Sequence, residues 1–222
     1  MDGRGVQATD RPGSGRIPPG RYRGLLVDFG GVLTSSVIGS FRAFCQAEGL
    51  AADAVLERLA ADPAARQLVV DLECGRIEEA TFEPAFADAL GVRPEGLIDR
   101  LLAGMLPDPE LPGVLLAVRR AGVRTGLLSN SWGHDRYDRS RFAELFDGVV
   151  ISGEVGLRKP EPEIYVLGAR AIGVDPDACV FVDDFEHNLE PARALGMATV
   201  HHTDAPRTVA ALEDLLGVPL RT

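Results

Sequence analysis

The first apolar run of the chain reads Leu25-Leu26-Val27-Asp28-Phe29-Gly30-Gly31-Val32-Leu33, with a carboxylate after its first three residues. Consecutive aliphatic side chains of this kind are typical of a short buried strand. The two adjacent glycines indicate that the chain turns sharply just beyond Asp28. The sequence therefore predicts a strand over 25–27 that presents Asp28 at its carboxyl end.

Downstream of Pro112, short apolar strands alternate with helical patterns. We expect strands over 125–128, 148–151, 179–182 and 198–200, separated by helices over 114–120, 142–146, 163–172, 190–195 and 208–216. Repeated βα units of this kind predict an α/β fold, a Rossmann-like parallel sheet with helices on both faces. Ligand sites in such sheets form at the carboxyl ends of the strands.

Between residues 37 and 106 the pattern is helical throughout. Five apolar sets at helical spacing follow one another, separated by glycine or proline. We expect a small all-helical cap domain over 37–106, inserted into an α/β core formed by 23–36 and 107–222. Residues 1–22 are rich in Gly, Pro, Arg and Asp, and they are expected to be a disordered leader.

Composition narrows the function classes. Hydrophobic residues make up 45% of the 222 residues, and the net charge of -10 argues against nucleic acid or an acidic membrane as a partner. No apolar run is long enough to cross a bilayer, and the start of the chain lacks a signal-like stretch, so we expect a cytoplasmic protein. Cys45, Cys74 and Cys179 lack metal-ligand spacing and are expected to be buried thiols.

Polar side chains stand where the strands are predicted to end. Ser129 and Asn130 end the second strand, and Asp183 and Asp184 end the fourth. Lys159, the only lysine in the chain, lies in a predicted loop. Each has a structural alternative as a turn, a cap or a solvated group. Together they predict a site for phosphoryl transfer. In such a site Mg²⁺ and the lysine neutralise negative charge around Asp28, the carboxylate expected to attack.

The order and spacing of these residues resemble the haloacid dehalogenase-like superfamily. Four motifs carry the resemblance: residues 25–33, Leu127-Leu128-Ser129-Asn130-Ser131, Lys159-Pro160 with Tyr165 downstream, and Phe181-Val182-Asp183-Asp184. The resemblance implies a hydrolase with a helical cap and catalytic roles for Asp28, Ser129 and Lys159. It implies phosphate binding by Ser129, Lys159, Asn130 and Gly31, and Mg²⁺ binding by Asp28, the Gly30 carbonyl, Asp183 and Asp184.

One position departs from the pattern of phosphatases in that superfamily. The resemblance makes Asp28 the nucleophile. Those phosphatases usually carry a second aspartate two residues later, and that second aspartate serves as general acid. This chain has Gly30 at that position. Glu186 and His187 are candidate substitutes. We expect a phosphatase acting on a small phosphorylated metabolite through an aspartyl-phosphate intermediate. The alternatives are a catalytically weak binding or regulatory protein and, last, a haloacid dehalogenase-type hydrolase.

Specificity is expected to come from residues 35–41 and from the cap. Glu73, Arg76 and Glu78 flank a turn that can face the site, although a solvated helix end is the favoured interpretation for each. Trp132 and His134 follow the second motif, so they are candidates to border the pocket. Trp132 has a second interpretation as packing beneath the cap.

Overall fold

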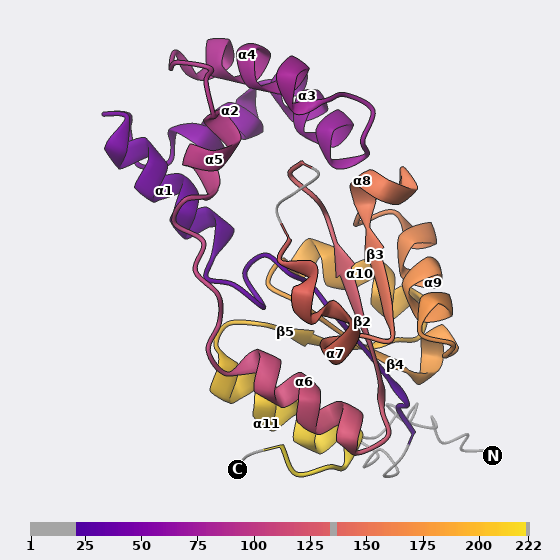
Figure 1. The fold of residues 1–222 in the computed structure, drawn as a ribbon. Helices are drawn as coiled ribbons and strands as arrows, with labels where there is room; N and C mark the ends of the chain where they lie inside the picture. The colour runs from indigo at the N-terminus through magenta and orange to yellow at the C-terminus, as the bar shows by residue number, and fades with distance from the viewer. Residues whose placement is uncertain (1–20, 134–136, 221–222) are drawn as a thin grey trace, which may run out of the picture.

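In a computed structural model, residues 21–133 and 137–220 are described, and they form a five-stranded parallel sheet in the order β3-β2-β1-β4-β5. The strands are β1 (Gly24–Val27), β2 (Arg124–Ser129), β3 (Gly148–Ile151), β4 (Cys179–Asp183) and β5 (Ala198–His201). Central strand β1 pairs Val27 with Leu127 of β2 and with Val182 of β4. The predicted α/β fold with a parallel sheet is therefore confirmed (Figure 1).

Both faces of the sheet are covered by helices. Leu25 and Val27 point to one face, which packs against α6 (Leu111–Arg120), α7 (Phe142–Leu145) and α11 (Ala205–Leu216). Leu26 points to the opposite face, which packs against α9 (Pro162–Ala171) and α10 (Glu186–Ala194). Short helices complete the core: α8 (Ser152–Val155), η1 (Arg139–Arg141) and η2 (Pro176–Ala178). The alternation along β1 follows from the two-residue period of a strand.

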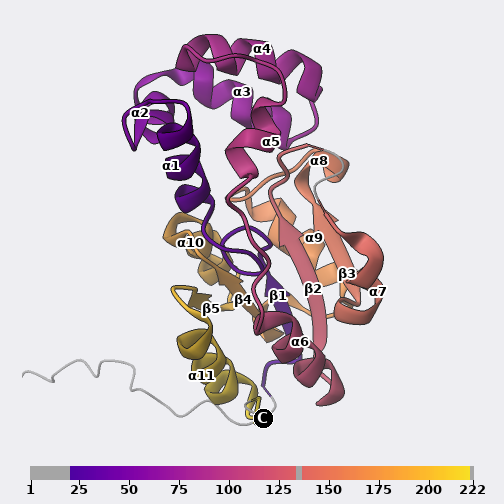
Figure 2. The same cartoon turned by 60° about the vertical axis from the view of Figure 1, so that its left-hand side comes forward.

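Five helices lie between β1 and β2 in sequence: α1 (Val37–Ala47), α2 (Ala54–Ala61), α3 (Pro63–Glu73), α4 (Glu79–Leu90) and α5 (Leu97–Leu102). They share a hydrophobic cluster of their own, separate from those on the two faces of the sheet. We call residues 37–106 the helical insert. In both ribbon views the insert gathers beyond one end of the sheet (Figures 1 and 2).

The two connections to the insert run side by side. Thr34 and Pro107 form an antiparallel bridge, and Ser35 donates its backbone N–H to Leu106. Ser40 of α1 also donates to the carbonyl of Leu101 at 2.6 Å and accepts from Gly104 N at 3.0 Å, tying α1 to the end of α5. As a division into domains, the boundaries at 36/37 and 106/107 stay a prediction.

The predicted leader, 1–22, lies outside the described residues except for Arg21 and Tyr22. Tyr22 is buried in the hydrophobic cluster with Leu25 and Val27, so it packs with the core, and the bounds of the leader stay a prediction. His134 also lies outside the described residues. Within the part of the chain that is described, no helix is both long and apolar enough to cross a membrane.

Candidate active site

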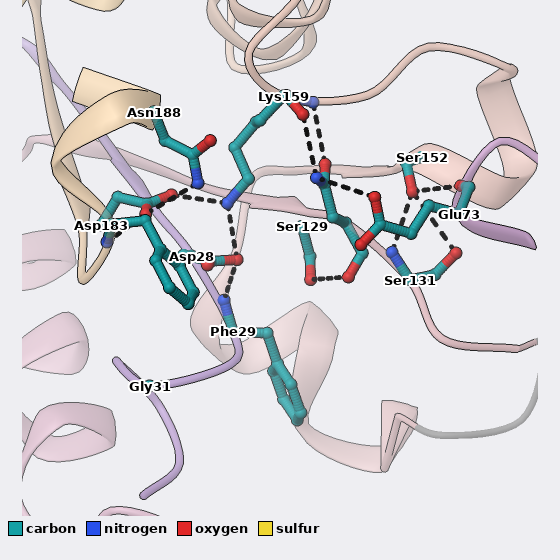
Figure 3. A network of polar contacts seen from close by, with 12 residues as sticks. Asp28, Phe29, Gly31, Glu73, Ser129, Ser131, Ser152, Lys159, Asp183 and Asn188 are labelled. Carbon is teal, nitrogen blue, oxygen red and sulfur yellow. Dashed lines mark hydrogen bonds and ion pairs between the residues drawn. The ribbon is translucent and has the colours of Figure 1, made fainter. Parts of the chain in front are cut away.

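The sheet brings the predicted site residues together at the carboxyl ends of neighbouring strands. Asp28 follows β1, Ser129 ends β2 and Asp183 ends β4. Because β1 lies between β2 and β4, with strand ends in register, these three residues meet at one edge. Lys159 reaches the same edge from the loop between α8 and α9 (Figure 3).

Lys159 is buried between two carboxylates. Its Nζ lies 2.8 Å from Asp28 Oδ1 and 2.6 Å from Asp183 Oδ2. Burial alone would lower the pKa of the ammonium, but Asp183 and Asp28 outweigh that effect and raise it. A compact ammonium fits between two carboxylates in a way that the wide, planar guanidinium does not. This position explains the use of a lysine in a chain whose other long basic side chains are all arginine.

Asp28, Asp183 and Asp184 form a cluster whose carboxylate oxygens, one from each residue, lie within 4.8 Å of one another. Burial, only partly offset by Lys159, raises the pKa of Asp28 to about 7, and the other two carboxylates add to the rise. Burial and the charge of Asp183 raise the pKa of Asp184 to about 6. Three carboxylates thus share one ammonium, and the remaining negative charge attracts a cation.

The two C-terminal members of the cluster differ in what they contact. Both oxygens of Asp183 are engaged: Oδ2 by Lys159, and Oδ1 by the backbone N–H of Phe185 at 2.8 Å and Asn188 Nδ2 at 3.0 Å. Asp184 Oδ1 is buried and has no hydrogen-bond partner among the described residues. An oxygen left unpaired in this way suits a metal ligand, because a buried polar atom otherwise lacks compensation for lost water.

Gly31 makes room for that carboxylate. Its φ is +74°, and a Cβ added there would lie 2.0 Å from Asp184 Oδ2. Its backbone N–H donates to Thr34 Oγ1 at 3.2 Å, and phosphate binding by Gly31 stays a prediction. A positive φ and this close approach both require glycine. The carboxylate oxygens that the three aspartates offer therefore fit a hard divalent cation, which prefers oxygen ligands.

The second motif supplies one residue to the site and one to its support. Ser129 shares a hydrogen bond of 2.9 Å with Tyr137, whose pKa burial raises, so the phenol stays neutral. The side chain of Asn130 holds the backbone of Lys159, and phosphate binding by Asn130 stays a prediction. Its Oδ1 accepts from Lys159 N at 2.9 Å, and its Nδ2 donates to Lys159 O at 3.1 Å.

A cavity of about 770 Å³ joins these residues to the insert. Trp132 lines it and also packs against Phe41 and Phe82 of the insert, so both interpretations of Trp132 hold. Glu73 lines it as a buried carboxylate, and the favoured interpretation of Glu73 as a solvated helix end was wrong. Arg76, in contrast, is an exposed residue paired with Asp71.

The two candidate substitute acids differ in position. His187 lines the cavity, whereas Glu186 pairs with Arg193 on the surface at 2.6 Å. Glu78 occupies the N-cap position of α4.

Val37 and Met105 lie beside Gly30, and a Cβ added to Gly30 would lie 2.9 Å from Val37 Cγ2. The place of the usual second aspartate is therefore filled by apolar atoms.

Sequence reasoning did not assign three residues that contact the side chains of the site, namely Tyr137, Arg158 and Asn188. Tyr137 has no motif signal, because it meets Ser129 only through tertiary folding. Arg158 precedes Lys159, but its ion pair joins it to Glu73, 85 residues away in sequence. Asn188 lies in α10, five residues after the Asp183 that it contacts, so a helical turn after β4 was the available signal.

Comparison with known proteins agrees with this arrangement. Residues 22–196 match a family model of haloacid dehalogenase-like hydrolases. Bifunctional epoxide hydrolase 2 of Sus scrofa is 36% identical over 47% of this chain, which is 20% of that protein. Glyceraldehyde 3-phosphate phosphatase of Methanopyrus kandleri is 33% identical over 46% of each chain, and sesquiterpene phosphatase of Aspergillus oryzae is 31% identical over 50% of this chain and 58% of that one.

Two solved structures are also similar to this chain. A HAD family enzyme of Bacteroides thetaiotaomicron, crystallised with magnesium and inorganic phosphate, is 25% identical with a TM-score of 0.59, covering 81% of this chain and 93% of that one. A predicted HAD-like hydrolase of Porphyromonas gingivalis is 25% identical with a TM-score of 0.64, covering 88% and 98%. With its sheet, its strand-end carboxylates and a family match over residues 22–196, this chain belongs to the haloacid dehalogenase-like hydrolases.

Proposed function

We propose that the protein is a Mg²⁺-dependent phosphatase in which Asp28 is the nucleophile. The observation that carries the proposal is the cluster of three carboxylates, two of them buried and in contact with the ammonium of Lys159. Such a site holds a divalent cation and brings an anionic phosphoryl group next to a carboxylate. The similarity to two phosphatases and to a structure crystallised with magnesium and phosphate supports it.

In the proposed reaction, a carboxylate oxygen of Asp28 attacks phosphorus, and the bond from phosphorus to the substrate's alcohol oxygen breaks. The leaving oxygen takes a proton, and water then hydrolyses the aspartyl phosphate to inorganic phosphate and free Asp28. Lys159 Nζ, held by Asp183, stabilises the negative charge of the transferring group. The Ser129 hydroxyl, oriented by Tyr137, holds one of its oxygens.

Asp28, Asp184 and the Gly30 carbonyl would hold Mg²⁺, with Asp183 serving mainly as the partner of Lys159. The unpaired Oδ1 of Asp184 and the engaged oxygens of Asp183 support this division of roles. When bound, the ion would neutralise charge on Asp28 and on the phosphoryl oxygens. The chain's own residues keep Asp28 in place and exclude water around it, since Asp28 is only 7% exposed.

The absence of an acid at Gly30 limits the leaving groups. An alkyl alcohol leaves poorly without a proton donor, whereas an acyl or aryl phosphate needs little protonation. His187, which lines the cavity, is the candidate proton donor to an alkyl leaving group. We therefore expect acyl and aryl phosphates to react fastest, and His187→Asn to slow alkyl esters selectively.

The cavity further suggests an apolar organic group on the substrate. The helical insert, proposed as the cap, contributes an aliphatic and aromatic wall: Val37, Ile38, Phe41, Leu56, Leu59 and Leu102. The arginine and lysine side chains in the described lining, Arg158 and Lys159, are both ion-paired with carboxylates. A second anionic group would thus find no unpaired Arg or Lys there. The sesquiterpene phosphatase therefore offers a better guide than the glyceraldehyde 3-phosphate phosphatase.

A substrate panel tests this proposal. Initial rates with Mg²⁺ are compared for decyl phosphate, glycerol 3-phosphate, an acyl phosphate and a 2-haloacid. We expect kcat/KM for decyl phosphate to exceed that for glycerol 3-phosphate by at least about tenfold, because each buried methylene contributes about 0.8 kcal/mol. Halide release in the presence of a chelator would favour the dehalogenase alternative. No turnover of any compound by the Mg²⁺-loaded protein would favour the regulatory one.

A further inference from the structure

Glu73, the last residue of α3, is a carboxylate of the insert whose partners all belong to the core. Its side chain is 8% exposed. It accepts from Arg158 Nε at 2.6 Å, from Trp132 Nε1 at 3.1 Å and from Asn130 Nδ2 at 3.4 Å. A buried carboxylate is costly unless it is paired and hydrogen-bonded, and here donors from the opposite side of the interface supply that compensation.

The backbone at the end of α3 makes a second set of contacts with the core. The Glu73 carbonyl accepts from Ser152 Oγ, which also accepts from the backbone N–H of Ser131 at 2.8 Å (Figure 3). Gly75 follows with a φ of +65°, and a Cβ added there would lie 2.5 Å from the Gly153 carbonyl oxygen. The end of α3 therefore meets both the second motif and the segment that leads to Lys159.

The donors to Glu73 flank the proposed catalytic residues. Asn130 follows Ser129, and Arg158 precedes Lys159. Asn130 also holds the backbone of Lys159 through its two hydrogen bonds. A shift of Glu73 would release Arg158 and one contact of Asn130 at once. The end of β2, which carries Ser129, and the loop that carries Lys159 are thus both held by contacts with the same carboxylate.

We propose that Glu73 is a positioning residue, which docks the insert on the core and aligns Lys159 and Ser129 for reaction. The kinetic part rests on the proposed function, because it requires Lys159 and Ser129 to act on substrate. The docking part does not. Glu73 itself is neutralised by Arg158, so it adds little repulsion toward an anionic substrate in the same cavity.

The chain contains a single tryptophan, and it is a partner of Glu73. Intrinsic fluorescence therefore reports this interface without a label. The test compares Glu73→Gln with Asp71→Asn, a change of a carboxylate on the same helix that contacts Gln67 and Arg76. We expect the Trp132 emission of Glu73→Gln to shift to longer wavelength, as water reaches the indole. Asp71→Asn should emit like the wild type.

Two further variants guard against a general folding defect. Glu73→Asp keeps the charge on a shorter side chain and should restore part of the wild-type emission. Arg158→Gln should give a shift similar to that of Glu73→Gln, and the double variant should add little to either, because both changes break the same pair. Circular dichroism at the assay temperature checks that each variant is folded.

The kinetic arm uses the best substrate of the panel. We expect kcat of Glu73→Gln to fall about 10- to 100-fold with a smaller change in KM, since misplaced catalytic groups cost that much. Asp71→Asn should keep its kcat. Unchanged Trp132 emission in Glu73→Gln would overturn the docking role whether or not the protein is a phosphatase. A shifted emission with an unchanged kcat would overturn the positioning role.

Discussion

At the scale of single residues, Gly30 stands where a phosphatase of this family usually has its general acid, so it tests whether that acid is what the site lacks. Its φ is not in the left-handed region, so the backbone accepts a side chain, but Val37 Cγ2 stands 2.9 Å from the position of a Cβ. We expect Gly30→Asp to gain little activity by itself and Gly30→Asp with Val37→Ala to raise alkyl-phosphate turnover, by up to about 100-fold if a general acid is restored. Steady-state rates of both and of Val37→Ala alone check this. A double variant no faster than Val37→Ala would show that acid catalysis is not what Gly30 lacks.

Gly31 permits a comparison with a second glycine of nearly equal φ. Gly91, which caps α4, has φ +72° and no atom within 4 Å of an added Cβ. Gly91→Ala should cost only the strain of the left-handed conformation, about 1–2 kcal/mol. Gly31→Ala should lower the free energy of unfolding by more than that, because the added methyl displaces Asp184. The same displacement should weaken Mg²⁺ binding. Urea unfolding and Mg²⁺ titration calorimetry measure both effects, and equal Mg²⁺ affinity in the two variants would contradict the proposed metal role of Asp184.

Sequence reasoning at this scale located residues better than it located their contacts. Asp28, Ser129, Lys159 and Asp183 meet as the strand-end pattern predicts, since parallel strands fix where their carboxyl ends lie. The side chain of Asn130 turns to the Lys159 backbone, which no local pattern encodes. Burial of Glu73 likewise depends on partners distant in sequence.

At the scale of secondary structure elements, Ser40 joins the first and last helices of the insert. It is 2% exposed and makes two hydrogen bonds to backbone atoms at the end of α5. Ser40→Ala leaves those buried groups unpaired, which costs about 1–3 kcal/mol. Ser36→Ala removes one exposed capping bond to Gly39 and should cost less. Thermal unfolding of the two variants measures the difference, and a larger loss in Ser36→Ala would contradict this role of Ser40.

Strands were predicted more accurately than helix starts. The range 148–151 coincides with β3, because a run of consecutive aliphatic residues, here Val149-Val150-Ile151, predicts a strand directly. Helix α10 begins at Glu186, earlier than the predicted 190, and α11 begins at Ala205, earlier than 208. The first turn of α10 is largely polar, and that of α11 holds Pro206 and Arg207, so apolar periodicity starts late in both. Asp204, whose side chain caps α11, was the signal that periodicity alone overlooks.

At the scale of the whole molecule, the number of helices in the insert was predictable, but its contacts with the core were not. Those contacts join Glu73 to residues such as Arg158, which no sequence period links. They create the cavity and decide which side chains line it. The residues that a substrate would meet are therefore set by the assembled fold, whereas Asp28, the proposed nucleophile, was already visible in one strand and the turn that follows it.

Metal binding should be visible in the stability of the entire chain. A ligand present at about 100 times its Kd stabilises a protein by about 2.7 kcal/mol, so saturating Mg²⁺ should raise Tm by about 5–10 °C above a chelated sample. Asp184→Asn should lose this increase. In chelator it should melt above the wild type, because one repelling carboxylate of the cluster is gone. Calorimetric scans measure both, and a full Mg²⁺ increase in Asp184→Asn would contradict the assignment.

Trapping the covalent intermediate tests the role of Asp28 most directly. Without a general base at Gly30, hydrolysis of the aspartyl phosphate should be slow enough for it to accumulate. Wild-type protein is mixed with Mg²⁺ and an acyl phosphate, quenched during the first turnover and reduced with borohydride, which converts an aspartyl phosphate to homoserine. We predict that peptide mass spectrometry finds homoserine at position 28 of the wild type. In Asp28→Asn we expect no enzymatic hydrolysis of the acyl phosphate and no homoserine. Continued hydrolysis by Asp28→Asn, with position 28 unmodified in the wild type, would contradict Asp28 as the nucleophile.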